Sequence, residues 1–482
     1  MILTLDLGTS VTKAALWSPD GLVALAEVAV VSDHPEPGTV EQRPADWWDS
    51  VVAACAALRD DHPDRLREVS AVGCTGARQT FGLFDASGAP LGPGIVWSDH
   101  RADREAARLV TGDWPGPGVG PPLDGASVPA KLAWLAAHRA DDLARCAWVL
   151  SPRDLVGWRL TGTVATDPTL ASLTGCYRTD GTVLGSMAGS AADRLPPVVP
   201  SERVAGTVAT PVAGELGLSP GVPVVLGAGD RQSEVVGTGA TAAVPMVSWG
   251  TTANVSLPVG DLPVPVPAGV VATRATDGGW LLEGGLSAAG SLLAWLGRLC
   301  GRPPAELAVL AATSPPGARG VTAVPWLGGA RAPWWRPEAG AAFVGLSGAH
   351  GPADLARAVL EGVALDVLRC LETMADRRPP GPAPSALGLA GGGGATPAWG
   401  AVLAGTTGLP VRHRRSGQAA SAGAALLAAR AVGETWDLGT LDPVAGTVVP
   451  GPGDVDRYAE LRPHADAVAS SLLGPGAPPT CG

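Results

Sequence analysis

The chain has 482 residues, of which 46% are hydrophobic and 16% are charged, and its formal net charge is −11. This length exceeds what a single hydrophobic core supports, so we expect two domains of roughly 200 residues or more. The excess of negative charge argues against a nucleic-acid partner, because the phosphate backbone would be repelled.

Cysteine usage and hydropathy indicate the compartment. The seven cysteines are scattered without a close pair, which fits neither a disulfide scaffold nor a zinc knuckle. No uninterrupted apolar run reaches the ~18 residues that a membrane helix needs, and no basic leader precedes the first apolar residues. The sequence therefore predicts a cytoplasmic protein with no membrane partner.

The first residues predict a β-hairpin. Residues 2–6 and 11–17 have the apolar pattern of strands, and the turn between them is Leu7-Gly8-Thr9-Ser10. Farther along, periodicity predicts a helix at 45–59 and strands at 69–74 and 81–84. Interleaved strands and helices predict an α/β fold.

A second hairpin is predicted at residues 246–256, again with two short strands, here around a Gly-Thr-Thr tip. Two such tips facing one cleft could hold two ends of one phosphate chain. We therefore place a domain boundary near residue 242. This gives domains at 1–242 and 243–450 and a tail at 451–482, whose Gly- and Pro-rich part after Leu472 is expected to be disordered.

The second half also carries helical patterns at residues 352–377 and 418–432. Between them, the glycine-rich loop 390–394 runs into a further predicted helix. Thr396 is expected to cap this helix and Pro397 to take its first position.

The N-terminal turn is the first candidate for chemistry, since no Walker-type G-x-x-x-x-G-K-[ST] loop is present. Asp6 stands at a strand end beside Gly8, Thr9 and Ser10. A carboxylate next to backbone N–H and hydroxyl donors suits a hydrated magnesium ion and phosphate oxygens. The alternative is a plain hairpin tip.

Asp230 is the second candidate. It follows the apolar strand at 222–226 through Gly227-Ala-Gly229, at the strand end where α/β proteins bind ligands. A carboxylate there can accept the proton of an attacking hydroxyl during phosphoryl transfer. The alternative is an aspartate that only caps the next helix.

The loop from Gly391 to Gly394 is the third candidate. It allows close approach of a flat ligand and directs a helix N-terminus at it, which suits a nucleotide. A tight strand-to-helix connection is the alternative. Thr251 and Thr252, at the second tip, leave the same choice open.

The order and context of these elements resemble the FGGY carbohydrate kinases, members of the actin/hexokinase-like ATPase superfamily. The resemblance covers about residues 1–450. Eight stretches each resemble a family block, in the family's order: LTLDLGTSVTKAALWSPDG, GLFDASGAPLGPGIVWSDHRA, ATDPTLASLTGCY, VVLGAGDRQSEVVGTGA, VSWGTT, RAPWWRPEAGAAFVGLSGAH, ADLARAVLEGVALDVL and GLAGGGGATPAWGAVLAGTTGLPV.

The resemblance implies two ribonuclease-H-like domains around a nucleotide and sugar cleft, and ATP-dependent phosphorylation of a small sugar or polyol. It implies ATP and Mg²⁺ as cofactors, Asp230 as general base, and Asp6 with Asp230 at the metal. By the same resemblance, residues from both tips and the glycine-rich loop would contact ATP: Gly8, Thr9, Ser10, Lys13, Gly250, Thr251, Thr252, Gly392, Gly393 and Gly394.

The acceptor pocket departs from the family's patterns. Residues 75–80 stand where the xylulokinase-like branch has a Gln-Met-His run, and Arg78 is closer to the Gln-Arg-Glu run of the glycerol kinase branch. Arg231 follows Asp230 where both branches carry an amide. The substrate-binding candidates are Arg78, Gln79, Trp97, Asp230 and Arg231. Arg78 could instead be a surface ion-pair partner, and Asp99 with Arg101 is expected to form a structural pair.

The predicted acceptor is a ketopentose such as D-xylulose, with glycerol or another polyol as the alternative. An actin- or chaperone-like ATPase and an inactive sugar-binding relative are the readings from other classes. The resemblance also allows a homodimer.

Overall fold

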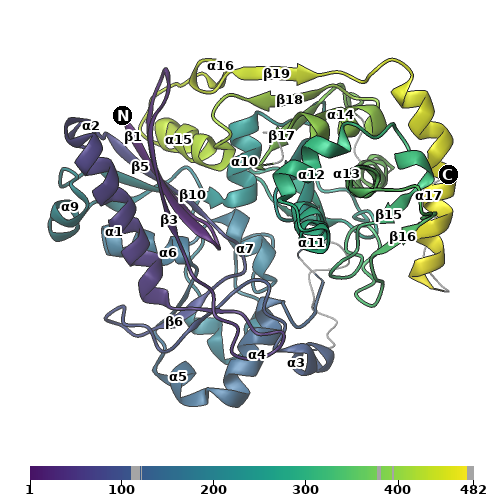
Figure 1. The fold of residues 1–482 in the computed structure, drawn as a ribbon. Coiled ribbons are helices and arrows are strands. Elements are labelled where there is room, and N and C mark those ends of the chain that lie inside the picture. Colours follow the sequence, from purple (N-terminus) through teal and green to yellow (C-terminus); the bar gives the residue numbers. More distant parts are fainter. Residues whose placement is uncertain (110–119, 121, 377–380, 393–395, 475–482) are drawn as a thin grey trace. The chain divides into compact units, whose positions relative to one another are not determined.

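The computed structural model describes residues 1–109, 120, 122–376, 381–392 and 396–474 (Figure 1). The chain forms two compact units. The first comprises Met1–Gly237, Thr273–Gly279 and Ala419–Pro443, and the second comprises Thr238–Ala272, Trp280–Gln418 and Val444–Gly482. The first crossing lies close to the predicted boundary at 242. The predicted domains are contiguous stretches, however, whereas the chain returns twice to the first unit.

A mixed six-stranded sheet forms the centre of the first unit. β1 pairs antiparallel with β2 and parallel with β5, and β5 pairs parallel with β10. The carboxyl ends of β1, β5 and β10 therefore meet at one edge of the sheet. In sheet order the strands are β3 (Gly21–Ala29), β2 (Val11–Ser18), β1 (Ile2–Leu7), β5 (Ala71–Gly76), β10 (Pro223–Gly229) and β9 (Val204–Thr207).

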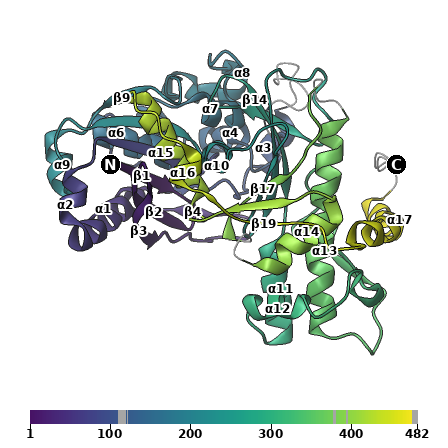
Figure 2. The same cartoon turned by 90° about the horizontal axis from the view of Figure 1, so that it is seen from above.

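Helices cover both faces of this sheet, because side chains on both faces are apolar. Leu3 and Leu5 pack with α1 (Pro44–Asp61) and α6 (Pro152–Thr161) on one face. Ile2 and its neighbours pack with α15 (Ala419–Ala431) on the other. Figure 2 shows α1 and α15 on opposite sides of β1 and β2. The hairpin predicted at residues 2–17 and the helices predicted at 45–59 and 418–432 are confirmed.

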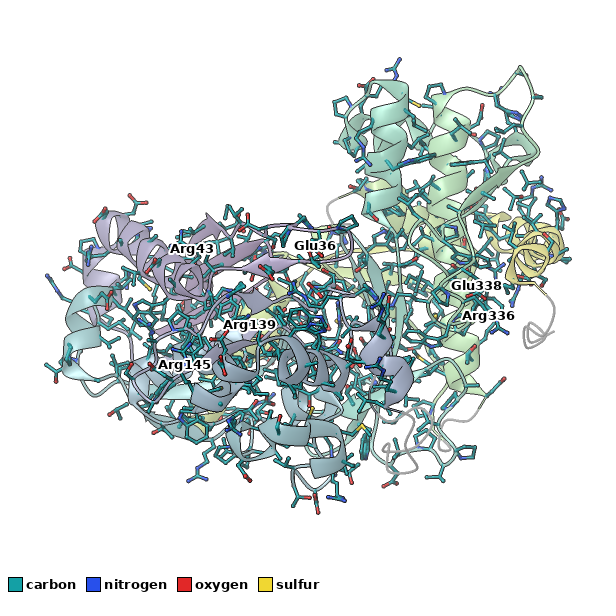
Figure 3. The ribbon with its side chains drawn as sticks, turned by 90° about the horizontal axis from the view of Figure 1, so that it is seen from below. Glu36, Arg43, Arg139, Arg145, Arg336 and Glu338 are labelled. Atoms are coloured by element: carbon teal, nitrogen blue, oxygen red, sulfur yellow. The ribbon has the colours of Figure 1, made fainter. Side chains whose placement is uncertain are left out.

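Residues 81–198 add a second core to the first unit. β6 (Gly82–Phe84) pairs with β8 (Trp148–Leu150), and the predicted strand at 81–84 is thereby confirmed. Arg139 and Arg145 flank Asp142 on both sides, and both arginines are labelled in Figure 3. The other elements of this unit are short: β4 (Glu41–Gln42), α2 (Pro63–Arg67), β7 (Gly94–Ile95), α3 (Asp103–Arg108), α4 (Val128–His138), α5 (Ala140–Arg145), α7 (Pro168–Thr174), α8 (Gly185–Ala188), α9 (Thr210–Leu216) and α16 (Leu438–Leu441).

The second unit is built on a seven-stranded sheet. Its long helix α13 (Pro352–Ala375) packs against the sheet and against α11 (Gly290–Cys300) and α12 (Pro304–Ala311), and the three helices lie side by side in Figure 2. In sheet order the strands are β13 (Val271–Arg274), β14 (Trp280–Leu286), β12 (Ala253–Val259), β11 (Met246–Trp249), β17 (Leu387–Ala390), β18 (Val411–Arg414) and β19 (Val444–Val448). A two-stranded sheet, β15 (Thr322–Val324) with β16 (Ala342–Val344), also packs here.

The predicted tail contains a helix, α17 (Asp454–Leu473), that packs in the second unit. Arg369 of α13 binds Asp466 of α17 at 2.5 Å, and Arg357 donates to the Tyr458 hydroxyl at 2.6 Å. These partly buried contacts join α17 to α13. The predicted disorder falls mostly on residues 475–482, which lie outside the described residues.

Thr396 corrects one prediction about helix capping. The helix α14 (Pro397–Thr407) begins with Pro397 as expected, and Thr396 stands at the cap position. Its side chain nevertheless accepts no hydrogen bond from the first turn, where the backbone N–H of Trp399 bonds the Thr396 carbonyl instead.

Among the helices of the described ranges, none is long and apolar enough to cross a membrane.

Candidate active site

The N-terminal tip is anchored by two side chains from elsewhere in the first unit. Gln42 Nε2 donates to the Thr9 carbonyl at 2.6 Å, and Trp97 Nε1 donates to the Thr9 hydroxyl at 3.2 Å. Ser10 is exposed, and its carbonyl accepts the Val30 N–H. The hairpin tip is therefore fixed on one side and open to solvent at Ser10.

Asp6 lies close enough to other carboxylates for their charges to change its pKa. Burial raises the pKa of the Asp6 carboxyl from 3.8 to about 7, the charges of Asp230 and Glu234 add to the rise, and the ammonium of Lys13 opposes it. Lys13 faces Asp6 across the β1–β2 pair and forms an ion pair with Glu27 at 2.9 Å. Carboxylates that repel one another at a strand edge are suited to a divalent cation.

The donor set can hold such a cation only with help from other ligands. Within the described ranges, no group of three or more His, Cys, Asp or Glu side chains is arranged to bind a metal ion. Mg²⁺ in phosphoryl-transfer sites is typically held by one or two carboxylates together with water and phosphate oxygens. Asp6 with Asp230 therefore fits a magnesium ion that arrives with a nucleotide.

Asp230 is the first residue of α10 (Asp230–Thr238), directly after β10. Its Oδ1 lies 3.4 Å from Arg78 Nε and accepts the Arg231 N–H at 2.7 Å. The Arg78 side chain is only 10% exposed, whereas that of Asp230 is 40% exposed. Arg78 is thus an ion-pair partner, but a largely buried one beside a more open carboxylate.

The remaining acceptor candidates have different surroundings. Gln79 adopts a positive φ of 64° and lines a small cavity of the first unit that also includes Tyr177. Arg231 forms an ion pair with Glu234, one helical turn along α10. Trp97 directs its N–H at Thr9, as described above. The structure brings Arg78, Arg231 and Asp230 together, and links Trp97 to the N-terminal tip.

In the second unit, the Gly-Thr-Thr tip packs on the start of α11. The Gly250 N–H donates to the Thr252 carbonyl at 2.9 Å, and the Thr251 carbonyl accepts N–H groups from residues 289 and 291. An open cavity of about 610 Å³ includes this tip and part of the glycine-rich loop among its lining residues: Trp249, Gly250, Thr251, Gly290, Ser291, Leu293, Gly392, Thr396 and Trp399.

This cavity brings Gly250, Thr251 and Gly392 together within one unit. Gly393 and Gly394 lie outside the described residues. The two tips belong to different units, so their joint grip on one nucleotide stays a prediction.

Several residues around the site escaped sequence reasoning. Gln42 holds the Thr9 carbonyl, and Lys131 donates to the carbonyls of Val96 and Trp97 from a fully buried position. Burial lowers the pKa of Lys131 to about 7. Its rarity was the available signal, since the chain has only one other lysine.

Asp99 and Arg101 form the expected structural pair. Asp99 is fully buried and accepts Arg101 N–H groups at 2.7–3.0 Å, and the Val40 N–H donates to the same carboxylate at 2.6 Å. The pair therefore joins the segment after β7 to the segment before β4.

Comparisons with known proteins agree over nearly the whole chain. The model of the FGGY carbohydrate kinase N-terminal domain matches residues 1–237, and that of the C-terminal domain matches residues 246–432. A xylulose kinase of Escherichia coli is 31% identical, over 96% of this chain and 97% of its own length. A glycerol kinase of Gloeobacter violaceus is also 31% identical, over 78% and 77%. The solved xylulose kinase of Rhodospirillum rubrum superposes with a TM-score of 0.86 at 28% identity, covering 98% of both chains.

The raised pKa of Asp6 predicts that metal-free protein loses stability as the pH rises. Between about pH 4 and 7 the folded form keeps a proton on Asp6 that the unfolded form has released, so the free energy of unfolding falls across this window. Asp6→Asn removes the titrating group. At pH 8, in the presence of a metal chelator, this variant should raise the free energy of unfolding by about 1–2 kcal/mol. This is less than the whole pKa shift would give, because the Asp6 side chain is partly exposed to solvent. Urea denaturation at several pH values measures this.

Asp20→Asn, at an exposed turn position, is the matched control and should leave the pH dependence unchanged. Identical pH profiles for the wild type and Asp6→Asn would contradict the prediction.

Proposed function

We propose that this protein phosphorylates a ketopentose such as D-xylulose, with Asp230 as general base. The premise is that both domain models match, so the chain belongs to the FGGY family of carbohydrate kinases and is an ATP-dependent sugar kinase. The observation that carries the proposal is the position of Asp230. This partly exposed carboxylate stands at the carboxyl end of β10, contacts Arg78 and influences the charge of Asp6.

The proposed step is a direct displacement. Asp230 takes the proton of the acceptor hydroxyl, the hydroxyl oxygen bonds the γ-phosphorus, and the bond from that phosphorus to the bridging β,γ-oxygen breaks to release ADP. Asp6, with Asp230 beside it, would hold Mg²⁺, which neutralises charge on the phosphates. No covalent intermediate on the protein is required.

Backbone and hydroxyl donors of the two tips would hold the phosphates. In the first unit these are Gly8, Thr9 and Ser10, with Lys13 nearby on β2. In the second unit, Gly250, Thr251 and Thr252 would do so, and the loop 392–394 would contact the adenosine. The cavity that includes Gly250 and Gly392 supports this part of the proposal, because its size suits a nucleoside.

Arg78 is proposed to recognise the acceptor, and Gln79, Trp97 and Arg231 are further candidate contacts. A guanidinium can donate to two vicinal hydroxyls, and a buried donor that is left unmatched disfavours the wrong acceptor. Similarity to xylulose kinase over the full length favours a ketopentose, whereas similarity to glycerol kinase and the presence of Arg78 keep glycerol as the alternative. The cytoplasmic location and the homodimer stay predictions.

A panel of acceptors tests the proposed substrate. ADP release should be measured with D-xylulose, other ketopentoses, glycerol and gluconate at saturating MgATP. The highest kcat/KM is expected for a ketopentose. A higher kcat/KM for glycerol would replace the proposal with the alternative, and turnover that no small acceptor increases would exclude both.

Asp230→Asn tests the general base. The amide cannot take the hydroxyl proton, so kcat should fall by about 100-fold or more. The KM for ATP should stay within about two-fold, because Asp6 and the amide oxygen can still serve the metal. Steady-state assays of ADP release with the best acceptor measure kcat and the KM for ATP. Asp64→Asn, at an exposed aspartate of α2, is the control. Near-normal turnover of Asp230→Asn would remove Asp230 from this role.

Arg78→Ala tests acceptor recognition. Loss of the guanidinium should lower kcat/KM for the preferred acceptor by about 10- to 100-fold, with little change in the KM for ATP. The differences in kcat/KM between the acceptors of the panel should become smaller. The exposed Arg67 of α2 provides the control variant Arg67→Ala. An unchanged acceptor profile would assign Arg78 to a structural role.

A further inference from the structure

The strand that leads to Asp230 does not end regularly. Its register with β5 shifts between Val225 and Ala228, and Gly227 adopts a φ of +68°. A Cβ at Gly227 would lie 2.0 Å from the Cys74 carbonyl oxygen, so only glycine fits this bulge. The backbone just before Asp230 therefore needs partners other than the strand ladder.

Three buried groups supply these partners. Arg153 Nη1 donates to the Gly227 carbonyl at 3.2 Å, and the Gly227 N–H donates to the Ser201 carbonyl at 3.1 Å. The Gly229 N–H donates to the Thr169 hydroxyl at 2.9 Å. Both ends of the short segment 227–229 are thus tied to side chains or backbone from α6, α7 and the segment before β9.

A fully buried carboxylate links these groups. Asp167 accepts from Arg153 Nη1, from the Thr169 hydroxyl and from the Ser201 hydroxyl, each at 2.7 Å. Because the Thr169 hydroxyl donates its hydrogen bond to Asp167, its lone pairs are left to accept a hydrogen bond from the Gly229 N–H. The carboxylate therefore fixes the direction of the bond that reaches β10.

We propose that Thr169, supported by Asp167 and Arg153, is a positioning residue that holds the peptide before Asp230 and so sets the direction of the Asp230 carboxylate. The proposal rests on the proposed role of Asp230 as general base. It gives a function to the segment Ala165–Tyr177, which the proposed chemistry does not otherwise use.

Helix capping alone does not account for this cluster. Asp167 does cap α7 through the N–H groups of residues 169 and 170. A cap needs neither a fully buried arginine nor a hydroxyl bonded to a neighbouring strand, and buried ion pairs add little net stability compared with apolar side chains. The cost of burying Arg153 and Asp167 is better explained by what they hold.

The geometry around Gly229 shows why a small shift there matters. A Cβ on Gly229 would lie 2.7 Å from Arg78 Cδ, so this peptide packs directly against the arginine that contacts Asp230. Rotation of the peptide would move the carboxylate and change its separation from Arg78 together. Displacement of a catalytic group by about 1 Å can cost roughly 100-fold in rate.

Thr169→Val tests the proposal, because valine keeps the shape and removes the hydroxyl. In the full-length enzyme with MgATP and the best acceptor of the panel, kcat should fall about ten-fold or more, while the KM for ATP changes by less than about two-fold. Thr169→Ser restores the hydroxyl and should recover most of kcat. Thr169→Ala removes the same hydroxyl with less volume and carries the same prediction if the valine variant does not fold.

Thr166→Val is the matched control. The Thr166 hydroxyl is also buried and accepts from the same Arg153, at 3.3 Å, but the backbone of Thr166 pairs with residues 197–199 and not with β10. Its melting temperature should fall about as much as that of Thr169→Val, with kcat near that of the wild type. Equal losses of kcat in the two variants, or a normal kcat in Thr169→Val, would overturn the proposal.

A double-mutant cycle separates this proposal from the proposed function. If Thr169 acts through Asp230, Thr169→Val should reduce kcat much less in the Asp230→Asn background than in the wild type. An undiminished effect in that background would overturn the positioning role. Normal turnover of Asp230→Asn alone would instead overturn the general base itself.

Discussion

The proposed site depends on one feature of the first unit, which is that two carboxylates stand at the same edge of its sheet. β1 and β10 flank β5 in parallel, so Asp6 and Asp230 are brought to the same edge by topology alone. Glu234 follows one turn along α10. Burial raises the pKa of the Asp6 carboxyl, and the charges of Asp230 and Glu234 raise it further. A divalent cation at this edge, as the proposed function requires, would offset the repulsion between the two carboxylates.

Buried hydrogen bonds hold the segments around these carboxylates, whereas the Asp230 side chain itself is partly exposed. Buried charged side chains, among them Lys131 and Arg153, donate to backbone carbonyls in the segments that carry Trp97 and Asp230. A buried charge is costly, and its hydrogen bonds are correspondingly hard to break. A chain with only 16% charged residues places several of them inside the first unit, next to the proposed site.

Sequence reasoning succeeded where the structural signal is local. The two hairpins and the helix α13 follow from periodicity and turn residues within short windows, and the position of Asp230 follows from an apolar strand ending in glycines. The return of α15 to the first unit could not be predicted in this way. Its alanine-rich surface has little helical asymmetry, and its place is decided by close packing on the sheet, where a Cβ at Gly73 would meet the Ala424 carbonyl at 2.6 Å.

The supporting residues were missed for a related reason. Gln42 and Thr169 have no motif of their own. Gln42 donates to the Thr9 carbonyl, 33 positions away, and Thr169 accepts from the Gly229 N–H, 60 positions away. Thr169 lies within a recognised family block, but the block by itself does not show which of its side chains faces β10. Such roles depend on tertiary contacts, which a single sequence does not contain.

The contacts of Trp97 limit how the acceptor can be recognised. Its indole N–H is already committed to the Thr9 hydroxyl, and its backbone N–H is committed to Thr80. A sugar could therefore meet the ring of Trp97 but could gain no hydrogen bond from its N–H without breaking the link to the tip. In the proposed function, polar discrimination among acceptors then depends on Arg78 and on the carboxylate that it contacts. Arg78 Nε lies 3.4 Å from Asp230 Oδ1, and Arg78 Nη1 lies 3.5 Å from Gln232 Oε1, so an acceptor hydroxyl would compete with these two long contacts for the guanidinium donors.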